Sequence, residues 1–355
     1  MNPPPTPTAP PLPLPAHLTP SLHDEPPLAP DAGDDAPPHI TIGTQLLNAA
    51  AIVIPFLGLL AAIAITWGWG VGWGELAVLA VMYLLTAGGV TVGFHRHFTH
   101  KSFSTSRPVQ WLLGILGSMS MQGTLLGWVA THRCHHQFSD RPGDPHSPHV
   151  DHDHAHMGGG LTGLVKGYLH AHLGWLFHDD PANLAKYIPD LLSDPTAQRI
   201  SRLFVLWVAL GILLPGVALG LLTGTWWGFF SGMLWGGLVR LFLVHHVTWS
   251  INSACHLWGQ RTYKSHDHSR NNALFGVLAL GEGWHNNHHA FPTSARHGLE
   301  WWQFDLSYLL IRSMAALGLV WDVKTPSRHR LEARKLGDTV VGPHGQPVTY
   351  TPRDG

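Results

Sequence analysis

Charge and cysteine are both scarce in this chain. Only 12% of its 355 residues are Asp, Glu, Lys or Arg, well below the roughly 25% of an ordinary soluble domain. The net charge of -1 gives no electrostatic footprint for nucleic acid. Two cysteines, Cys134 and Cys255, exclude a disulfide framework. No H-E-x-x-H motif occurs, and no strand precedes the glycine-rich segment 68–74, so a dinucleotide-binding turn is not expected there.

Apolar residues, in contrast, make up 45% of the chain, and its 16 tryptophans and 28 histidines are unusually many. Four apolar stretches lie at 46–67, 75–94, 202–222 and 226–247. Each is long enough to cross a bilayer core, which takes about 20 helical residues. Together with the low charge, they predict an all-α integral membrane protein with four transmembrane helices in two hairpins.

A further apolar segment, 109–130, is long enough to span but carries four polar residues. If it spanned, the histidines before and after it would lie on opposite faces of the membrane. With four spans, every histidine-rich segment lies on one face, and nearly all lysines and arginines lie there too. The positive-inside rule predicts that this face is cytoplasmic. We therefore expect a cytoplasmic helical cap, with 305–321 as an interfacial or packing helix.

The two ends of the chain differ in composition from the region between them. Residues 1–38 are dominated by proline, with five acidic residues and no lysine or arginine, a composition that cannot bury a core. We expect a disordered leader over 1–43, a membrane domain over 44–336 and a loose tail over 337–355. Arg240, near the inner end of the fourth span, is expected to snorkel or to face a cavity.

Histidines cluster at the cytoplasmic ends of the predicted spans. The motif GFHRHFTH gives His95 and His100 in an H-x4-H pattern, and NSACHLWG gives Asn252 and His256. Residues five apart do not share a helix face cleanly, so His95 and His100 would need a bend or different metals.

Two further motifs have the form H-x-x-H-H: His132, His135 and His136 in the first, and His285, His288 and His289 in the second. Residues three and four apart lie on one face of a helix, so each triplet is expected to aim three imidazoles at one place. Nine imidazoles exceed the four ligands of one structural zinc and fit two ions of higher coordination. Nitrogen ligands suit iron, copper or zinc. A two-metal redox centre facing an apolar core indicates oxygen chemistry on a lipid chain.

The motifs GFHRHFTH, HRCHH, NSACHLWG and GEGWHNNHHAFP, in this order with spans between them, resemble the membrane fatty-acid desaturase family. The resemblance covers about residues 44–325 and is closest to the stearoyl-CoA and delta-9 acyl-lipid branch. It implies a di-iron centre held by the nine histidines, with Asn252 binding it through water. Thr248 and Trp249 match residues of the bent acyl tunnel, and with Trp128 and Arg240 they form our predicted substrate-tunnel set.

The implied activity is the insertion of a cis double bond, expected at delta-9, into a saturated fatty acyl chain with O2 as co-substrate. No HPGG haem-binding signature occurs, so we expect a separate electron donor such as a ferredoxin, cytochrome or flavin reductase. A membrane hydroxylase shares the histidine pattern and is the main alternative. A metal transporter would place ionisable residues at mid-membrane. A zinc hydrolase would normally add a catalytic carboxylate beside the histidines; Glu282 is near the fourth motif, but no H-E-x-x-H occurs.

The sequence departs from the family's acyl-CoA enzymes at two places. Ala130 and Thr131 stand where the animal enzymes carry the Arg-Asp pair that meets coenzyme A. Their DPHNxxRG pattern survives only at 144–146. An acyl chain on coenzyme A, on a lipid or on a carrier protein therefore stays open. The histidine-rich run 146–160 exceeds the family pattern and is expected to be a solvated insertion, with loose metal binding as the alternative.

Overall fold

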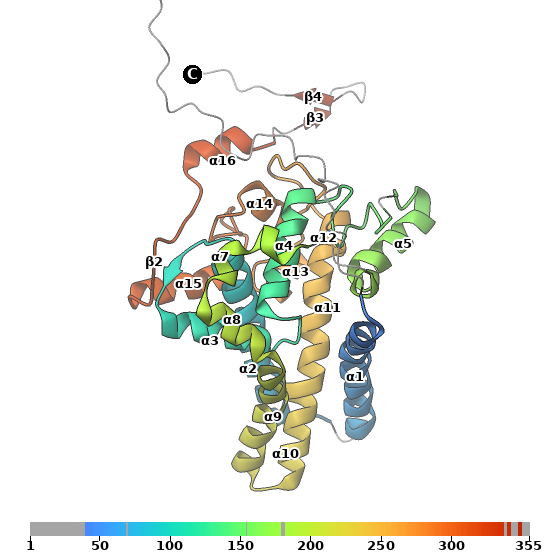
Figure 1. Cartoon of the computed structure of the whole chain (residues 1–355), viewed down its shortest axis with the longest axis vertical. Coiled ribbons are helices and arrows are strands. Elements are labelled where there is room, and N and C mark those ends of the chain that lie inside the picture. The colour runs from blue at the N-terminus through green and yellow to red at the C-terminus, as the bar shows by residue number, and fades with distance from the viewer. Residues whose placement is uncertain are drawn as a thin grey trace, which may run out of the picture. The chain divides into compact units, whose positions relative to one another are not determined.

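The computed structural model describes residues 40–68, 70–153, 155–178 and 182–336, and the backbone of 339–341 and 347–349. All of them belong to one unit, Pro37–Gly355. Most of the predicted leader and part of the predicted tail lie outside the described residues. Figure 1 shows a predominantly helical structure with two small strand pairs.

Four helical segments are long and apolar enough to cross a membrane. They are α1 (Ile42–Thr66), α2 (Trp73–Gly88) with the π-helix η1 (Gly89–Thr99), α9 (Phe204–Thr223), and the run of α10 (Trp226–Gly232), π-helix η3 (Met233–Val239), α11 (Arg240–Asn252) and α12 (Ala254–Leu257). The prediction of four spans is confirmed. The second and fourth extend further than expected, to residues 99 and 257, and these extensions carry histidines of the predicted site.

The long helices pack on one another through close contacts at small residues. α9 lies against α10 and η3, and both α1 and α2 lie against η3. A Cβ on Gly232 would lie 2.5 Å from the carbonyl oxygen of Pro215, so glycine permits the approach of α10 to α9. Outward-facing apolar side chains such as Leu57 and Leu221 are exposed, as expected for surfaces that meet lipid. The pairing into two hairpins stays a prediction.

Arg240 has a structural environment that differs from the prediction. Its side chain is fully buried and donates hydrogen bonds to three backbone carbonyls, at 3.1 Å to Gly236, 2.8 Å to Met119 and 2.7 Å to Gly211. Pro215 lacks the N–H that would otherwise bond the Gly211 carbonyl in α9. Arg240 supplies this missing donor, so it links helices instead of snorkelling to the interface.

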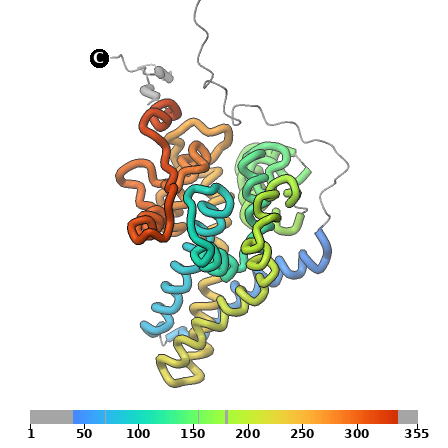
Figure 2. The backbone as a smooth tube through the Cα atoms, turned by 60° about the vertical axis from the view of Figure 1, so that its left-hand side comes forward, coloured from blue at the N-terminus to red at the C-terminus, as the bar shows by residue number. Residues whose placement is uncertain are grey.

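The shorter helices gather at the histidine-bearing ends of the long helices, as Figure 2 shows. They are α3 (Arg107–Ser118), α4 (Leu125–Phe138), α5 (Gly160–His172), the 3-10 helix η2 (Gly174–Phe177), α6 (Leu184–Tyr187), α7 (Pro189–Leu192), α8 (Pro195–Arg202), α13 (Ala273–Leu278), α14 (His285–Ala290), α15 (Leu306–Ala316) and α16 (Arg328–Arg334). The segment 109–130 is divided between α3 and α4 and forms no span, as predicted.

Two strand pairs complete the described structure. β1 (Ser104–Thr105) pairs antiparallel with β2 (Val320–Trp321) and so joins the chain after η1 to the chain after α15. β3 (Thr339–Val341) pairs with β4 (Pro347–Thr349) within the predicted tail. A buried apolar cluster, which includes Phe94, Phe98, Val129 and Ile200, packs η1 against α4 and α8. This cluster fixes the two helices that carry the first histidines.

Candidate metal centre

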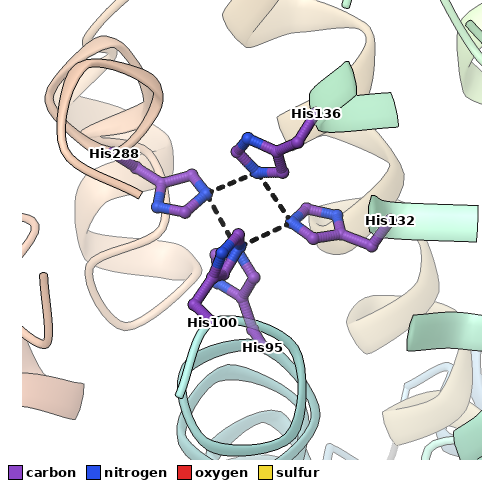
Figure 3. Close-up of side chains that lie close together, drawn as sticks. All are labelled: His95, His100, His132, His136 and His288. Carbon is purple, nitrogen blue, oxygen red and sulfur yellow. Dashed lines mark hydrogen bonds between the residues drawn. The ribbon is translucent and has the colours of Figure 1, made fainter. Parts of the chain in front are cut away.

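Five of the predicted histidines form one group, drawn in Figure 3: His95, His100, His132, His136 and His288. Each offers a ring nitrogen within 4.8 Å of the others. Nε2 of His288 lies 2.9 Å from Nε2 of His136 and 3.1 Å from Nε2 of His95. Nε2 of His132 lies 3.0 Å from Nε2 of His136 and 3.2 Å from Nε2 of His100. The end of η1, α4 and α14 thus converge on one point.

The other four predicted histidines form a second group: His135, His256, His285 and His289. All four are buried. Nε2 of His285 lies 3.0 Å from Nε2 of His256. The groups are adjacent, since the rings of His136 and His289 are stacked with centroids 4.5 Å apart. All nine histidines that the sequence singled out therefore lie together, as a five and a four.

The π-helix η1 explains how His95 and His100 reach the same group. In a π-helix each N–H bonds the carbonyl five residues earlier, and the N–H of His100 does bond the carbonyl of His95, at 3.1 Å. Residues five apart then lie closer to one face than they do in an α-helix. The expected bend or separate metals are not needed, because the helix itself changes pitch.

The expectation that each H-x-x-H-H triplet aims at one place is wrong. On α4, His132 and His136 join the group of five while His135 joins the group of four. On α14 the division is reversed, with His288 in the group of five and the other two in the group of four. At 3.6 residues per turn, side chains at i+3 and i+4 point about 100° apart. Each short helix therefore lies between the two groups and serves both.

Buried carboxylates bind the outer nitrogens of four of these imidazoles. The Nδ1-to-oxygen pairs are His95–Glu282 at 2.6 Å, His135–Asp144 at 2.9 Å, His256–Asp140 at 2.8 Å and His289–Asp267 at 2.5 Å. A carboxylate on Nδ1 leaves Nε2 directed toward the group, which is the usual arrangement behind metal-binding histidines. Glu282 also binds Arg96, at 3.2 Å, so its carboxylate is engaged and does not stand ready as the base of a zinc hydrolase.

The protonation states of His288, His132 and Asp267 agree with such a role. Burial, reinforced by neighbouring histidines, lowers the pKa of His288 and His132 well below the usual range, so these imidazoles are neutral. Burial alone would raise the pKa of Asp267, but the adjacent His289 holds it well below its usual range. Metal binding requires neutral imidazoles, and an anionic carboxylate on the outer nitrogen supports that state.

Two buried nitrogens test whether a metal fits. Nε2 of His135 and Nε2 of His289 have no hydrogen-bond partner among the described residues. Such an atom costs about 1–3 kcal/mol when nothing binds it. Imidazole nitrogens suit iron, copper and zinc, and nine of them in two adjacent groups fit two ions.

A cavity of about 280 Å³ leads from the long helices to the histidines. Ile52 of α1, Ala87 of α2 and Val244 of α11 line its apolar part. His95 and His132 of the first group and His285 of the second also line it. An apolar ligand in this cavity would lie against both groups.

All predicted tunnel residues except Arg240 line this cavity. Thr248, Trp249 and Trp128 line it, as does Asn252. Gln122 donates a hydrogen bond to Thr248 at 2.9 Å and so joins the α3–α4 turn to α11. The ring of Trp128 stacks on His132 with centroids 5.0 Å apart. Arg240 does not line the cavity.

Sequence reasoning missed the supporting carboxylates as a set. Asp140 and Asp144 closely follow the second histidine motif, and Asp267 and Glu282 precede the last one, which was the available signal. It also missed His297, whose Nδ1 lies 3.2 Å from Glu282. Of the histidines set aside, His97 bonds the Phe103 carbonyl and His245 the Ser120 carbonyl, outside both groups.

Four helices able to span a membrane, a cavity with an apolar part and two groups of histidines able to hold a metal characterise this protein. The chain belongs to the fatty acid desaturase family, whose pattern matches residues 68–322. It is therefore an oxidoreductase of the fatty acid desaturase type.

Three relatives place the chain within the family. It is 45% identical to the hex-5-enoyl-[acyl-carrier protein] acetylenase of Moorena producens (strain JHB), over 80% of this chain and 87% of the relative. It is 40% identical to the sn-1 stearoyl-lipid 9-desaturase of Anabaena variabilis, over 71% and 85%. It is 36% identical to delta-9 acyl-lipid desaturase 1 of Arabidopsis thaliana, over 78% and 82%. The predicted family and branch are confirmed.

Proposed function

We propose that the protein inserts a cis double bond at the delta-9 position of a saturated fatty acyl chain, with two iron ions held by the nine histidines. The observation that carries the proposal is the cavity, because its lining joins apolar helix surfaces to imidazoles of both groups. The two irons would supply the oxygen-dependent removal of two hydrogen atoms from adjacent methylenes. The overall reaction takes one O2, two electrons and two protons, and releases two waters.

The chain's own residues would hold the substrate and keep water out. Ile52, Ala87 and Val244 offer the acyl chain an apolar lining. The Gln122–Thr248 hydrogen bond lies in the cavity wall and would help to fix the path of the chain. Trp128, stacked on His132, shields that imidazole on one side. Holding one methylene in place against the metals is the main contribution such a scaffold can make.

We also propose a source of electrons and the side of the membrane on which the metal centre lies. Electrons would come from a separate ferredoxin, cytochrome or flavin reductase that docks on the cytoplasmic side, where the histidine-bearing ends are expected to lie. Asn252 lines the cavity and would bind the metal centre through water. The acyl chain would be carried by a lipid, by a carrier protein or by coenzyme A.

Fatty-acid analysis of a bacterial host that expresses the chain with a ferredoxin and its reductase tests the proposal. We expect a new monounsaturated acid with its double bond at delta-9, located after derivatisation, and its loss in His288→Ala. Hydroxylated chains would favour the hydroxylase instead. A triple bond would favour the activity named for the Moorena producens relative. Unchanged lipids, with iron-loaded protein present, would contradict the proposal.

A further inference from the structure

A third group of histidines lies outside the two described above. His152, His170 and His178 each offer a ring nitrogen, and these nitrogens lie within 4.8 Å of one another. None is among the nine predicted ligands. His152 lies in the histidine-rich run 146–160, His170 lies on α5, and His178 directly follows η2. Three separate segments of the chain therefore meet at this group.

We propose that these three histidines bind a divalent transition-metal ion, with zinc as the best match. Three imidazoles leave one tetrahedral position for water or a carboxylate. Asp153 is a candidate for that position, since its Oδ2 lies 3.4 Å from Nε2 of His152. A nitrogen-dominated ligand set disfavours magnesium and calcium.

The group needs a rearrangement of its rings to bind an ion. The rings of His152 and His178 are stacked, with centroids 3.7 Å apart and planes inclined by 13°, so their lone pairs lie in nearly parallel planes and do not converge. The His152 side chain is 43% exposed, so a large part of its ring faces solvent. His170 contributes a buried Nε2 that has no hydrogen-bond partner among the described residues, a nitrogen that an ion would satisfy.

An ion bound by these three histidines would stabilise part of the cavity wall. Trp175 and Leu176 of η2 line the cavity that leads to the central histidines. The Leu176 carbonyl accepts a hydrogen bond from Asn48 of α1 at 2.6 Å. A metal held by all three histidines would tie η2 to α5 and to the run 146–160. It would stabilise this wall of the cavity independently of the two central groups.

Zinc binding by the full-length, iron-loaded protein in detergent tests the proposal without any need for activity. The protein would be incubated with zinc chloride and desalted, and zinc and iron would be counted per chain. We expect the wild type to retain one zinc that His152→Ala and His178→Asn lose, with the iron count equal in all three. The exposed His156, which lies in the same run but outside the group, provides the matched control, and His156→Ala should keep the zinc.

Three results would overturn the proposal. One is a wild type that retains no zinc, and another is zinc that persists in both His152→Ala and His178→Asn. The third is a gain of zinc matched by a loss of iron, because the zinc would then occupy the central groups. Loss of zinc in His156→Ala as well would show diffuse binding by the run as a whole, and this too would contradict a defined site.

Discussion

Carboxylates orient the imidazoles at the centre of this protein. The Oε2 of Glu282 lies 2.6 Å from Nδ1 of His95, and Oε1 and Oε2 of the same side chain also face Arg96 and His297. Burial alone would raise the pKa of Glu282, but its contacts with His95, His297 and the Arg96 guanidinium hold it well below its usual range. Glu282 is thus an anion that fixes the proton of His95 on Nδ1 and leaves Nε2 for a metal.

Replacing Glu282 by Gln should lower iron retention or activity by about 10–100-fold, the usual effect of removing such a supporting partner. The amide loses the charge that positions His95, and Arg96 loses one of its two anionic partners. Iron per chain and the rate of double-bond formation would be measured together. Glu300→Gln serves as the control, since Glu300 pairs with Lys335 outside both groups. Full iron and full activity in Glu282→Gln would contradict this role.

The change from α2 to η1 decides where the first histidines point. An amphipathic pattern assumes one helical pitch, so the sequence predicted a span but could not show that its last turns are wound as a π-helix. The existence of the four helices was predictable because each is a long apolar run. The division of each triplet between two groups was not, because it depends on how α4 and α14 are rotated against η1 by tertiary packing. The nine histidines could be chosen from the sequence because the motifs contain them. The environment of Arg240 could not be predicted, because its carbonyl partners Met119 and Gly211 come from distant segments.

Close contact between η1 and α3 should make Gly89 intolerant of substitution. A Cβ on Gly89 would lie 2.2 Å from the backbone nitrogen of Gly117 and 2.4 Å from the carbonyl carbon of Leu116. Backbone atoms cannot rotate away, so Gly89→Ala should cost about 1–3 kcal/mol of stability. Thermal unfolding in one detergent would be compared with Gly88→Ala, where a Cβ meets nothing within 4 Å. Equal melting temperatures for the two variants would show that the contact is not as close as described.

The two histidine groups join helices from distant parts of the chain. They link η1, α4, α12 and α14, which are up to about two hundred residues apart in sequence. Metal ions bound here would act as crosslinks between the membrane helices and the shorter helices. Because a ligand that binds only the folded state stabilises it, the metals should contribute to the stability of the whole protein.

Removal of iron by a chelator should lower the melting temperature of the wild type. One ion present at a hundred times its dissociation constant contributes about 2.7 kcal/mol. Tryptophan fluorescence, with 16 tryptophans in the chain, would follow unfolding before and after chelation, and readdition of iron should restore the original value. In His288→Ala the effect of the chelator should be smaller. An unchanged melting temperature of the wild type after chelation would argue against metals at these groups.

Neither short helix with an H-x-x-H-H triplet belongs to one group alone. α4 gives two imidazoles to the group of five and one to the other, and α14 does the reverse. An ion in either group would therefore fix the rotation of both helices about their axes and align imidazoles for the second ion. The two occupancies become thermodynamically linked. Limited iron should then divide the population into doubly loaded and empty molecules, with few molecules that hold a single ion.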